Sequence, residues 1–378
     1  VKQTIINNSE KTYNFYPYGQ IIRNEIPDIT NFFILHEGPL GVFNSELVEK
    51  DYDDIQEKSY SVNADKGWLG ITDKYWITSI IPQENRKFRA DFDYKNKFRT
   101  NFIESNATEI GANETKSNEI KILLAAKEVR IIDEYAEKLN IEKLDLVIDW
   151  GYLYFLTKPM WFALDYFFNL LGNYGLAIIA VTVCIRIVLF PLAQMSFRSM
   201  SRMKLLQPEM TRLKELHKED KVKLQQEMMA LYKREKVNPM SGCLPILPMI
   251  FIFFSLYKVL FVTLDGRHEP FFLWIKDLSE RDPSSIFNLF GLIPWDPPTF
   301  LLIGAWPILM GISMYIQQLL NPPMPDPVQR RIFQFFPLVL TIILAPFPSG
   351  LVIYWTVNNV LQMAQQYLVL RKTKVKSA

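Results

Sequence analysis

Apolar residues are distributed unevenly along the 378-residue chain. The first 145 or so residues mix polar, charged and apolar side chains, whereas the rest of the chain contains long apolar segments. Five of these segments come close to the length that a hydrocarbon core about 30 Å thick requires of a helix. The predicted membrane spans are residues 175–192, 244–264, 300–320, 332–347 and 351–370.

The fourth predicted span is the weakest, because its sixteen residues reach only about 24 Å at 1.5 Å per residue. It ends at residues 346–350, PFPSG, where two prolines and a glycine break a helix. We therefore expect a short helix that turns directly into the fifth span.

Residues 149–171 approach the first span and are crowded with aromatic side chains. Lys158, Pro159 and Asp165 interrupt the segment, so it is not expected to cross the membrane. Aromatic side chains at this density favour the headgroup level of a bilayer. A helix on the outer membrane surface is predicted here, either as a simple anchor or with an active role.

The connection between the first two spans has an apolar repeat of its own. Apolar residues recur at spacings of three and four over residues 203–213 and again over residues 224–231. This periodicity predicts a hairpin of two amphipathic helices. Methionine suits a surface that accepts varied apolar partners, although the same side chains can equally form the seam of the hairpin. The candidate capture residues are Met200, Met203, Met210, Met228 and Met229.

Basic residues indicate how the chain is oriented. Residues 193–242 contain eleven lysines and arginines and residues 371–378 contain four, whereas residues 265–298 contain three. By the positive-inside rule, the hairpin and the tail are cytoplasmic and the N-terminal domain is outside. The predicted parts are a domain at 1–145, an interfacial helix at 146–172, a span at 173–192, the hairpin at 193–242, four spans within 243–370 around an outer loop at 265–298, and the tail at 371–378.

Arg186 lies inside the first apolar segment. An uncompensated charge in the middle of a bilayer costs about 2.5 to 3.5 kcal/mol on insertion scales, so it is usually kept where water, protein or a substrate receives it. Arg186 is also six residues from the end of the segment, so its long side chain could instead reach the interface. The two readings have about equal weight from position alone.

The last predicted span carries a second polar group. Trp355, Asn359, Gln362 and Gln366 follow at spacings of four, three and four, which puts them on one face of a helix. Polar residues of this kind can simply join helices by hydrogen bonds. A stripe of this length, together with Arg186 in the first span, instead predicts a polar cavity open to the cytoplasm. The other candidate lining residues are Thr182, Gln317 and Asn358.

The remaining composition excludes several classes of protein. Cys184 and Cys243 are isolated in apolar surroundings, so we expect two buried cysteines and neither a disulfide framework nor a metal site. No HExxH motif and no GxxxxGK[ST] loop occur, so we expect no enzyme, no cofactor, no nucleotide and no specific DNA partner. A secondary transporter or an anion channel is the alternative, although no repeated halves are visible.

Several motifs resemble the YidC/Oxa/Alb family of membrane insertases. They occur in the family's order from about Trp68 to the C terminus. They read DWGYLYF, GNYGLAIIAVTVCIRIVLFPL, SMSRMKLLQPEM, QQEMMALYKREKVNPMSGCLPILP, PFFLWIKDLSERDP and FPSGLVIYWTVNN. The resemblance implies an α-helical polytopic membrane protein, a five-helix insertase core with a cytoplasmic helical hairpin. Residues 1–145 resemble the C-terminal part of a periplasmic β-sandwich domain, so we expect an N-terminal anchor and the rest of that domain to precede Val1.

The resemblance also implies a function. Arg186 would project into a hydrophilic groove that opens to the cytoplasm and the lipid, with Tyr354 and Trp355 as an aromatic wall. The implied partners are nascent membrane proteins, the lipid bilayer, the ribosome at the hairpin, and the SecYEG/SecDF translocon. The implied location is the bacterial inner membrane, with the N-terminal domain periplasmic and the C terminus cytoplasmic.

Overall fold

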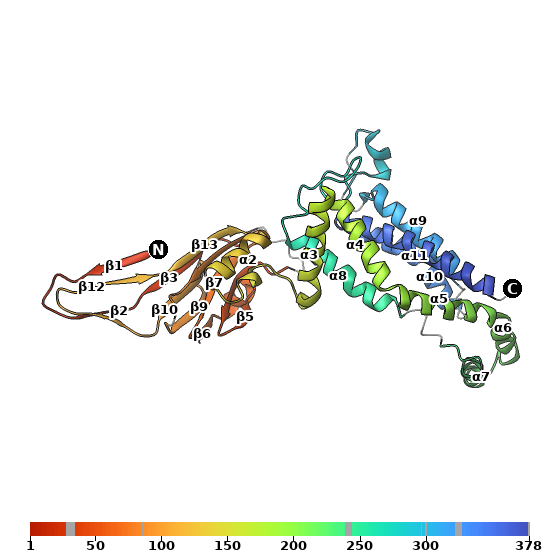
Figure 1. The fold of residues 1–378 in the computed structure, drawn as a ribbon, viewed down its shortest axis with the longest axis horizontal. Coiled ribbons are helices and arrows are strands. Elements are labelled where there is room, and N and C mark those ends of the chain that lie inside the picture. Colours follow the sequence, from red (N-terminus) through yellow and green to blue (C-terminus); the bar gives the residue numbers. More distant parts are fainter. Residues whose placement is uncertain are drawn as a thin grey trace. The chain divides into compact units, whose positions relative to one another are not determined.

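The computed structural model describes residues 1–27, 35–84, 86–238, 244–295, 297–298, 301–321 and 327–376, and leaves out the side chains of 221, 291, 327–329 and 370–376. The chain divides into two compact units, Val1–Tyr152 with Val262–Leu264 and Leu153–Phe261 with Asp265–Ala378. The first unit is rich in strands and the second is helical (Figure 1).

The first unit contains a sandwich of two antiparallel sheets. One sheet has the strand order β3-β10-β9-β6 and the other β13-β8-β7-β4-β5, while β1 with β12 and β2 with β11 form two short ribbons. The strands are β1 (Lys2–Ile6), β2 (Tyr13–Phe15), β3 (Tyr18–Arg23), β4 (Gly38–Phe43), β5 (Glu46–Glu49), β6 (Tyr60–Ala64), β7 (Gly67–Thr72), β8 (Trp76–Ile81), β9 (Phe88–Tyr94), β10 (Phe98–Glu104), β11 (Thr108–Ile110), β12 (Thr115–Glu119) and β13 (Lys121–Ala126).

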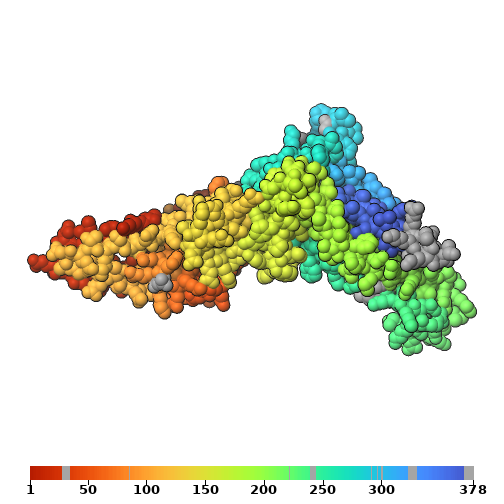
Figure 2. All heavy atoms as spheres, viewed as in Figure 1, coloured from red at the N-terminus to blue at the C-terminus, as the bar shows by residue number. Residues whose placement is uncertain are grey.

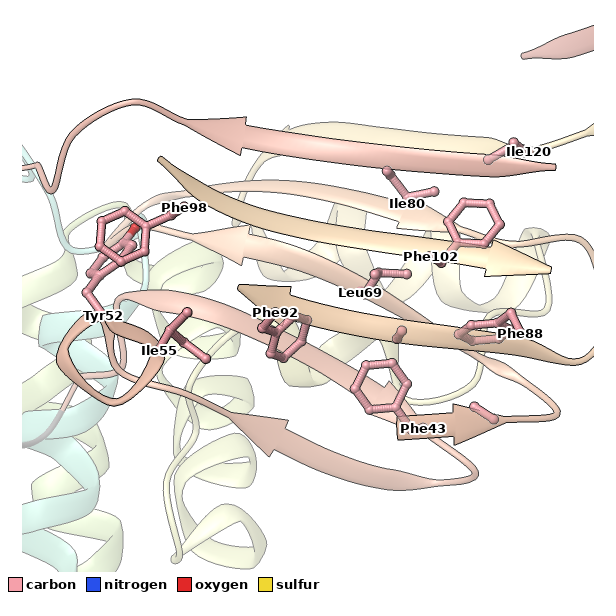
Figure 3. Packing of buried hydrophobic residues seen from close by; sticks show 12 residues of the cluster. Phe43, Tyr52, Ile55, Leu69, Ile80, Phe88, Phe92, Phe98, Phe102 and Ile120 are labelled. Carbon is pink, nitrogen blue, oxygen red and sulfur yellow. The ribbon is translucent and has the colours of Figure 1, made fainter. Parts of the chain in front are cut away.

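Aromatic side chains fill the space between the two sheets (Figure 3). Every second residue of β9 and β10 is buried, as expected for strands with one face on a core. Phe88 of β9 and Phe102 of β10 meet edge to face, with ring centroids 6.0 Å apart. Leu69 of β7 and Ile80 of β8 pack against them from the other sheet. Burying such a side chain contributes about 1.5 to 3 kcal/mol each, so this cluster holds the two sheets together.

Three short helical segments cover the sandwich: α1 (Tyr52–Glu57), α2 (Val129–Lys138) and the 3-10 helix η1 (Leu144–Val147). Arg23 Nη1 donates a hydrogen bond to the Tyr52 hydroxyl at 2.9 Å, and its Nη2 donates to Asp73 Oδ2 at 2.7 Å. Burial raises the pKa of Tyr52 to about 12, so its hydroxyl stays protonated at neutral pH. This network connects α1 with β3 and the end of β7.

The second unit consists of helices. They are α3 (Tyr154–Leu171), α4 (Tyr174–Val188), α5 (Phe190–Leu205), α6 (Gln207–Leu216), α7 (Lys221–Arg234), α8 (Ile246–Val262), the 3-10 helix η3 (Ile286–Gly291), α9 (Ala305–Leu320), α10 (Pro327–Leu344) and α11 (Ser349–Lys376). The last helix, α11, packs against α4, α5 and α9, while α3 packs on α4 and α10 on α9. Helix α11 therefore joins α4 and α5 to α9.

The helix boundaries differ from the predicted spans in several places. The first span was predicted to end at Leu192, but α4 ends at Val188 and the chain bends by 64° into α5. Pro191 in the first turn of α5 explains the bend, because proline lacks an N–H and clashes with the preceding turn. Residues 193–205, predicted as part of the hairpin, therefore belong to α5.

Within the described ranges, no single helix is both long and apolar enough to span a membrane, whereas the bent pair α4–α5 qualifies by length and composition. Helix α8 is apolar but shorter. Cys184, which was expected to be buried, is exposed on α4, and Cys243 lies outside the described residues.

The core of the sandwich allows a matched test of these packing contributions. Leu69→Ala, at a fully buried position, should lower the free energy of unfolding of the first unit by about 2 to 5 kcal/mol. Leu124→Ala makes the same chemical change on β13, where the side chain is 73% exposed, and should cost less than about 0.5 kcal/mol. Pulse proteolysis of the full chain in urea measures both. If the two variants unfolded at the same urea concentration, the core described above would be contradicted.

Candidate functional site

Arg186 lies in the last turn of α4 and is only 6% exposed. Its Nε donates a hydrogen bond to Asn358 Oδ1 at 2.7 Å. Its Nη2 donates two more, to the backbone oxygen of Asn358 at 3.0 Å and to Gln362 Oε1 at 3.0 Å. Both partners lie one turn apart on α11. The side chain therefore crosses from α4 to α11 instead of following its own helix to the surface.

The charge of Arg186 has no acidic partner in the part of the chain that the structure describes. All three hydrogen bonds go to neutral amide oxygens, through Nε and Nη2. A guanidinium carries five N–H donors, so the two on Nη1 have no partner among the described residues. A buried cation without a counter-ion is costly, and amide dipoles compensate it only in part. The site is therefore suited to receive an anion or a peptide carbonyl.

The polar residues of α11 divide between two neighbouring helices. Towards α4, Gln365 Nε2 donates to the backbone oxygen of Arg186 at 3.2 Å, beside the contacts of Asn358 and Gln362. Towards α9, Asn359 Nδ2 donates to Ser313 Oγ at 2.9 Å. Consecutive helical residues point about 100° apart, so Asn358 and Asn359 cannot face the same neighbour. The single stripe expected from the sequence is thus two sets of contacts on one helix.

The contacts between α9 and α11 continue one to two turns further along. Gln317 Nε2 donates to Gln366 Oε1 at 3.0 Å, and both side chains are buried. Ser313, which the sequence analysis did not single out, lies four residues before Gln317 and thus on the same face of α9. Two polar residues four apart in an otherwise apolar helix were the feature of the sequence from which Ser313 could have been predicted.

Three other candidate residues have different surroundings. Thr182 Oγ1 donates to the Ile178 backbone oxygen at 2.6 Å, within its own helix. Tyr354 is 2% exposed and close enough to Arg186 to interact with its charge. The Trp355 ring packs edge to face on Phe253 of α8, with centroids 4.8 Å apart. Trp355 therefore belongs to an apolar cluster shared with α8 and α9, while Tyr354 lies beside the arginine.

The hairpin residues also separate into two kinds. Helices α6 and α7 pack together, and Met210 of α6 and Leu231 of α7 are buried. Met228 on α7 is half-buried, whereas Met229 on the same helix is 51% exposed. Met203 is also half-buried but lies near the end of α5, outside the pair α6 and α7. Arg234 Nη2 bonds Glu209 Oε1 at 2.6 Å across the pair, an exposed contact worth little by itself.

The fifth methionine, Met200, is not in the hairpin at all. It lies in α5 and packs beside Ala193, Phe197 and Val369 of α11. Met200 therefore packs among the helices α5 and α11 and not in the hairpin formed by α6 and α7.

The other end of the bundle is held by the segment that follows α8. Asn173 Nδ2, at the start of α4, donates to the Pro270 oxygen at 3.2 Å, and Ser349 N of α11 donates to the Glu280 oxygen at 2.7 Å. At the start of α9, Trp306 N donates to Asp282 Oδ2 at 2.9 Å. One segment thus joins the first turns of α4, α9 and α11, about three helical turns from Arg186.

The described residues contain no group of three or more His, Cys, Asp or Glu side chains placed to hold a metal ion. The polar cluster around Arg186 is made of a guanidinium, amides and hydroxyls. Its chemistry is hydrogen bonding and charge attraction.

Comparison with known proteins extends over both units. Residues 1–163 match the family model described as YidC periplasmic domain, and residues 166–376 match the model described as 60Kd inner membrane protein. A solved structure of an active YidC insertase aligns with a TM-score of 0.46 at 17% sequence identity, covering 87% of this chain and 82% of that one.

Curated relatives match along the whole chain. The membrane protein insertase YidC of Pelagibacter ubique (strain HTCC1062) is 65% identical over 377 residues, which cover 100% of this chain and 68% of the relative. The YidC insertase of Rickettsia prowazekii (strain Madrid E) is 46% identical over 376 residues, covering 98% and 67%. The resemblance seen in the sequence motifs is confirmed, and the chain belongs to the YidC family of membrane protein insertases.

Proposed function

We propose that this chain moves short polar segments of nascent membrane proteins through a hydrophilic groove and releases their apolar helices into the lipid bilayer. The observation that carries the proposal is the buried Arg186 guanidinium. Among the described residues it bonds only to neutral amides, and its two Nη1 donors have no partner there. Peptide groups that cross hydrocarbon without partners cost several kcal/mol each. A polar region partway through the membrane shortens the apolar path they must cross.

Arg186 provides attraction for acidic segments in this scheme. Two opposite charges 4 Å apart attract by roughly 4 kcal/mol at an effective dielectric constant of 20, against roughly 1 kcal/mol in water. Because Asn358 and Gln362 are neutral, they hold the guanidinium in place without cancelling its charge. An incoming carboxylate or peptide carbonyl is then received by the free Nη1 donors.

The driving free energy comes from the apolar helix of the substrate. Helices α8 and α10 carry exposed apolar side chains along which such a helix can slide into lipid. On α8 these are Ile250, Phe251 and Phe254, and on α10 they include Phe335, Leu338 and Ile342. No nucleotide is required for this partitioning.

The proposal includes an orientation and partners. The helical unit lies in the bacterial inner membrane as a multi-pass bundle, with the first unit in the periplasm and the hairpin and C terminus in the cytoplasm. The eleven basic residues of 193–242 support this orientation. The exposed surface of α7, including Met229, receives substrates and the ribosome, and the chain acts alone or beside the SecYEG/SecDF translocon.

Substitution of Arg186 tests the electrostatic part of the proposal. With the full chain in liposomes and a single-span substrate with an acidic tail, Arg186→Ala and Arg186→Glu should slow insertion about tenfold or more, the equivalent of about 1.4 kcal/mol. Arg186→Lys keeps the charge and should retain most of the rate. Arg198→Ala removes an exposed arginine from α5 and serves as the matched control. The measurement is protease protection of the substrate with time.

An acidic and a neutral tail should respond differently to these variants. If Arg186→Glu inserted both tails equally well, the attraction would not be electrostatic. Anion flux through the same liposomes would support the transporter or channel alternative instead.

A near-isosteric change at Asn358 tests the same idea without touching the arginine. Asn358→Asp keeps the oxygen that accepts from Arg186 Nε but supplies an internal carboxylate. The charge of Arg186 is then neutralised in place, so the advantage of acidic over neutral tails should fall severalfold while neutral tails insert at the normal rate. The readout is the ratio of the two insertion rates. An unchanged ratio would show that the uncompensated charge of Arg186 does not favour the insertion of acidic tails.

Replacing residues 207–234 by a flexible Gly/Ser linker tests the hairpin without removing α5. Substrate cross-linking and insertion should both decline severalfold, because the exposed surface of α7 is lost while the contacts of Arg186 are retained. Glu209→Gln removes only the ion pair with Arg234 and should have little effect. Normal insertion by the linker variant would mean that the hairpin is merely a connection.

A further inference from the structure

An uncharged apolar segment follows Asp282, before helix α9 begins. Residues 283–295 read PSSIFNLFGLIPW and contain no ionisable side chain. Residues 286–295 of this stretch are called the tip segment. In it, Leu289 is 52% exposed, Phe290 is 56% exposed and Leu292 is 83% exposed. The other exposed apolar side chains are Ile286, Phe287, Ile293 and Trp295. So many exposed apolar side chains in one short segment indicate a site of interaction.

The tip segment has a defined backbone, so this exposure is built into its fold. Phe290 N donates to the Ser285 oxygen at 2.8 Å, and Ile293 N donates to the Asn288 oxygen at 3.0 Å. Leu289 and Phe290 have φ values of 48° and 58°, a left-handed conformation that is unfavourable for two successive non-glycine residues. The backbone thus holds a strained turn that keeps the side chains of Leu289 and Phe290 exposed.

The base of the tip segment is attached to the start of α9. The buried Asp282 accepts hydrogen bonds from Trp306 N at 2.9 Å, from Ser284 N at 2.9 Å and from Trp274 Nε1 at 3.0 Å. A carboxylate at the first turn of a helix is also favoured by the helix dipole. A Cβ at Gly304 would lie 2.4 Å from Asp282 Cγ, so the chain passes tightly over this anchor. Figures 1 and 2 show this segment, in teal to light blue, standing out from the helical unit.

The neighbouring surface of α9 indicates what covers the tip segment. Leu309, Ile312, Ile316 and Leu319 are exposed and follow at spacings of three, four and three, so they form one apolar face. The proposed function places this face in lipid. The base of the tip segment is bonded to the first turn of α9 through Asp282 and Ser284. The phenylalanines, the tryptophan and the lack of charge in the tip segment are typical of segments at the membrane interface.

We infer that the tip segment inserts into the outer leaflet of the bilayer, where headgroups and upper acyl chains cover its apolar side chains. The inference rests on the proposed membrane location of the helical unit, but not on the role of Arg186. It adds a second contact with lipid at the end of the bundle opposite the arginine. The strained turn at Leu289 and Phe290 then presents apolar side chains to the leaflet.

Fluorescence quenching in vesicles tests this contact. The full chain, with Cys184→Ser and Cys243→Ser, receives a single Leu292→Cys labelled with an environment-sensitive fluorophore and is reconstituted in phosphatidylethanolamine/phosphatidylglycerol vesicles. The emission should shift to the blue and be quenched by a lipid with a nitroxide near the headgroup. Quenching by aqueous iodide should be at least fivefold weaker than for Glu280→Cys, an exposed charged position before the base. Ile293→Cys provides a second probe if the first variant folds poorly.

Two outcomes would overturn the inference. Strong iodide quenching at residue 292 would place the tip segment in water, and protection from both quenchers would mean that protein covers it, whether a second copy or another chain. Adding Arg186→Ala to the labelled chain should leave the quenching unchanged. Lipid quenching together with normal insertion by Arg186→Ala would therefore reject the proposed role of Arg186 while retaining the membrane contact.

Discussion

The hydrogen bonds of one buried arginine organise the helical unit. Arg186 connects α4 to α11 through Asn358 and Gln362, and α11 in turn connects to α9 through Asn359 and Ser313. These contacts orient the guanidinium while leaving its charge unneutralised, since each of its partners among the described residues is a neutral amide oxygen. A buried cation in this state is costly for the protein alone and is stabilised once an anion arrives. The same contacts therefore serve both the packing of the helices and the proposed capture of acidic segments.

The two ends of the bundle are built differently. Near Arg186, amide side chains of α11 bond to α4 and α9. At the other end, the segment that follows α8 bonds to the starts of α4, α9 and α11 through backbone groups and Asp282. Backbone groups and the buried carboxylate of Asp282 hold the helices together at that end. Amide side chains can exchange partners with a substrate at low cost, since a new hydrogen bond replaces the one that is lost. This asymmetry fits the proposed groove, which would admit polar segments from the end near Arg186.

The apolar surface of the helical unit is as informative as its polar cluster. Exposed side chains on α8, α9 and α10 would be unfavourable in water but cost nothing in lipid. Cys184 illustrates the point, because a cysteine in an apolar run was expected to be buried against protein and is instead exposed on α4. The sandwich of the first unit follows the opposite rule, with its aromatic side chains enclosed between two sheets.

The sequence predicted the two-part organisation, the apolar segments that form α8 to α11, the place of Arg186 in an apolar segment, the periodicity of α6 and α7, and the family. It did so because each of these depends on local pattern or on motifs. The direction of each side chain depended on the tertiary structure. The tertiary structure divided the polar residues of α11 between α4 and α9, brought Ser313 into the cluster, turned Trp355 towards α8, and placed Met200 in α5. Periodicity defines the faces of one helix, but the neighbour that each face meets depends on how all the helices pack.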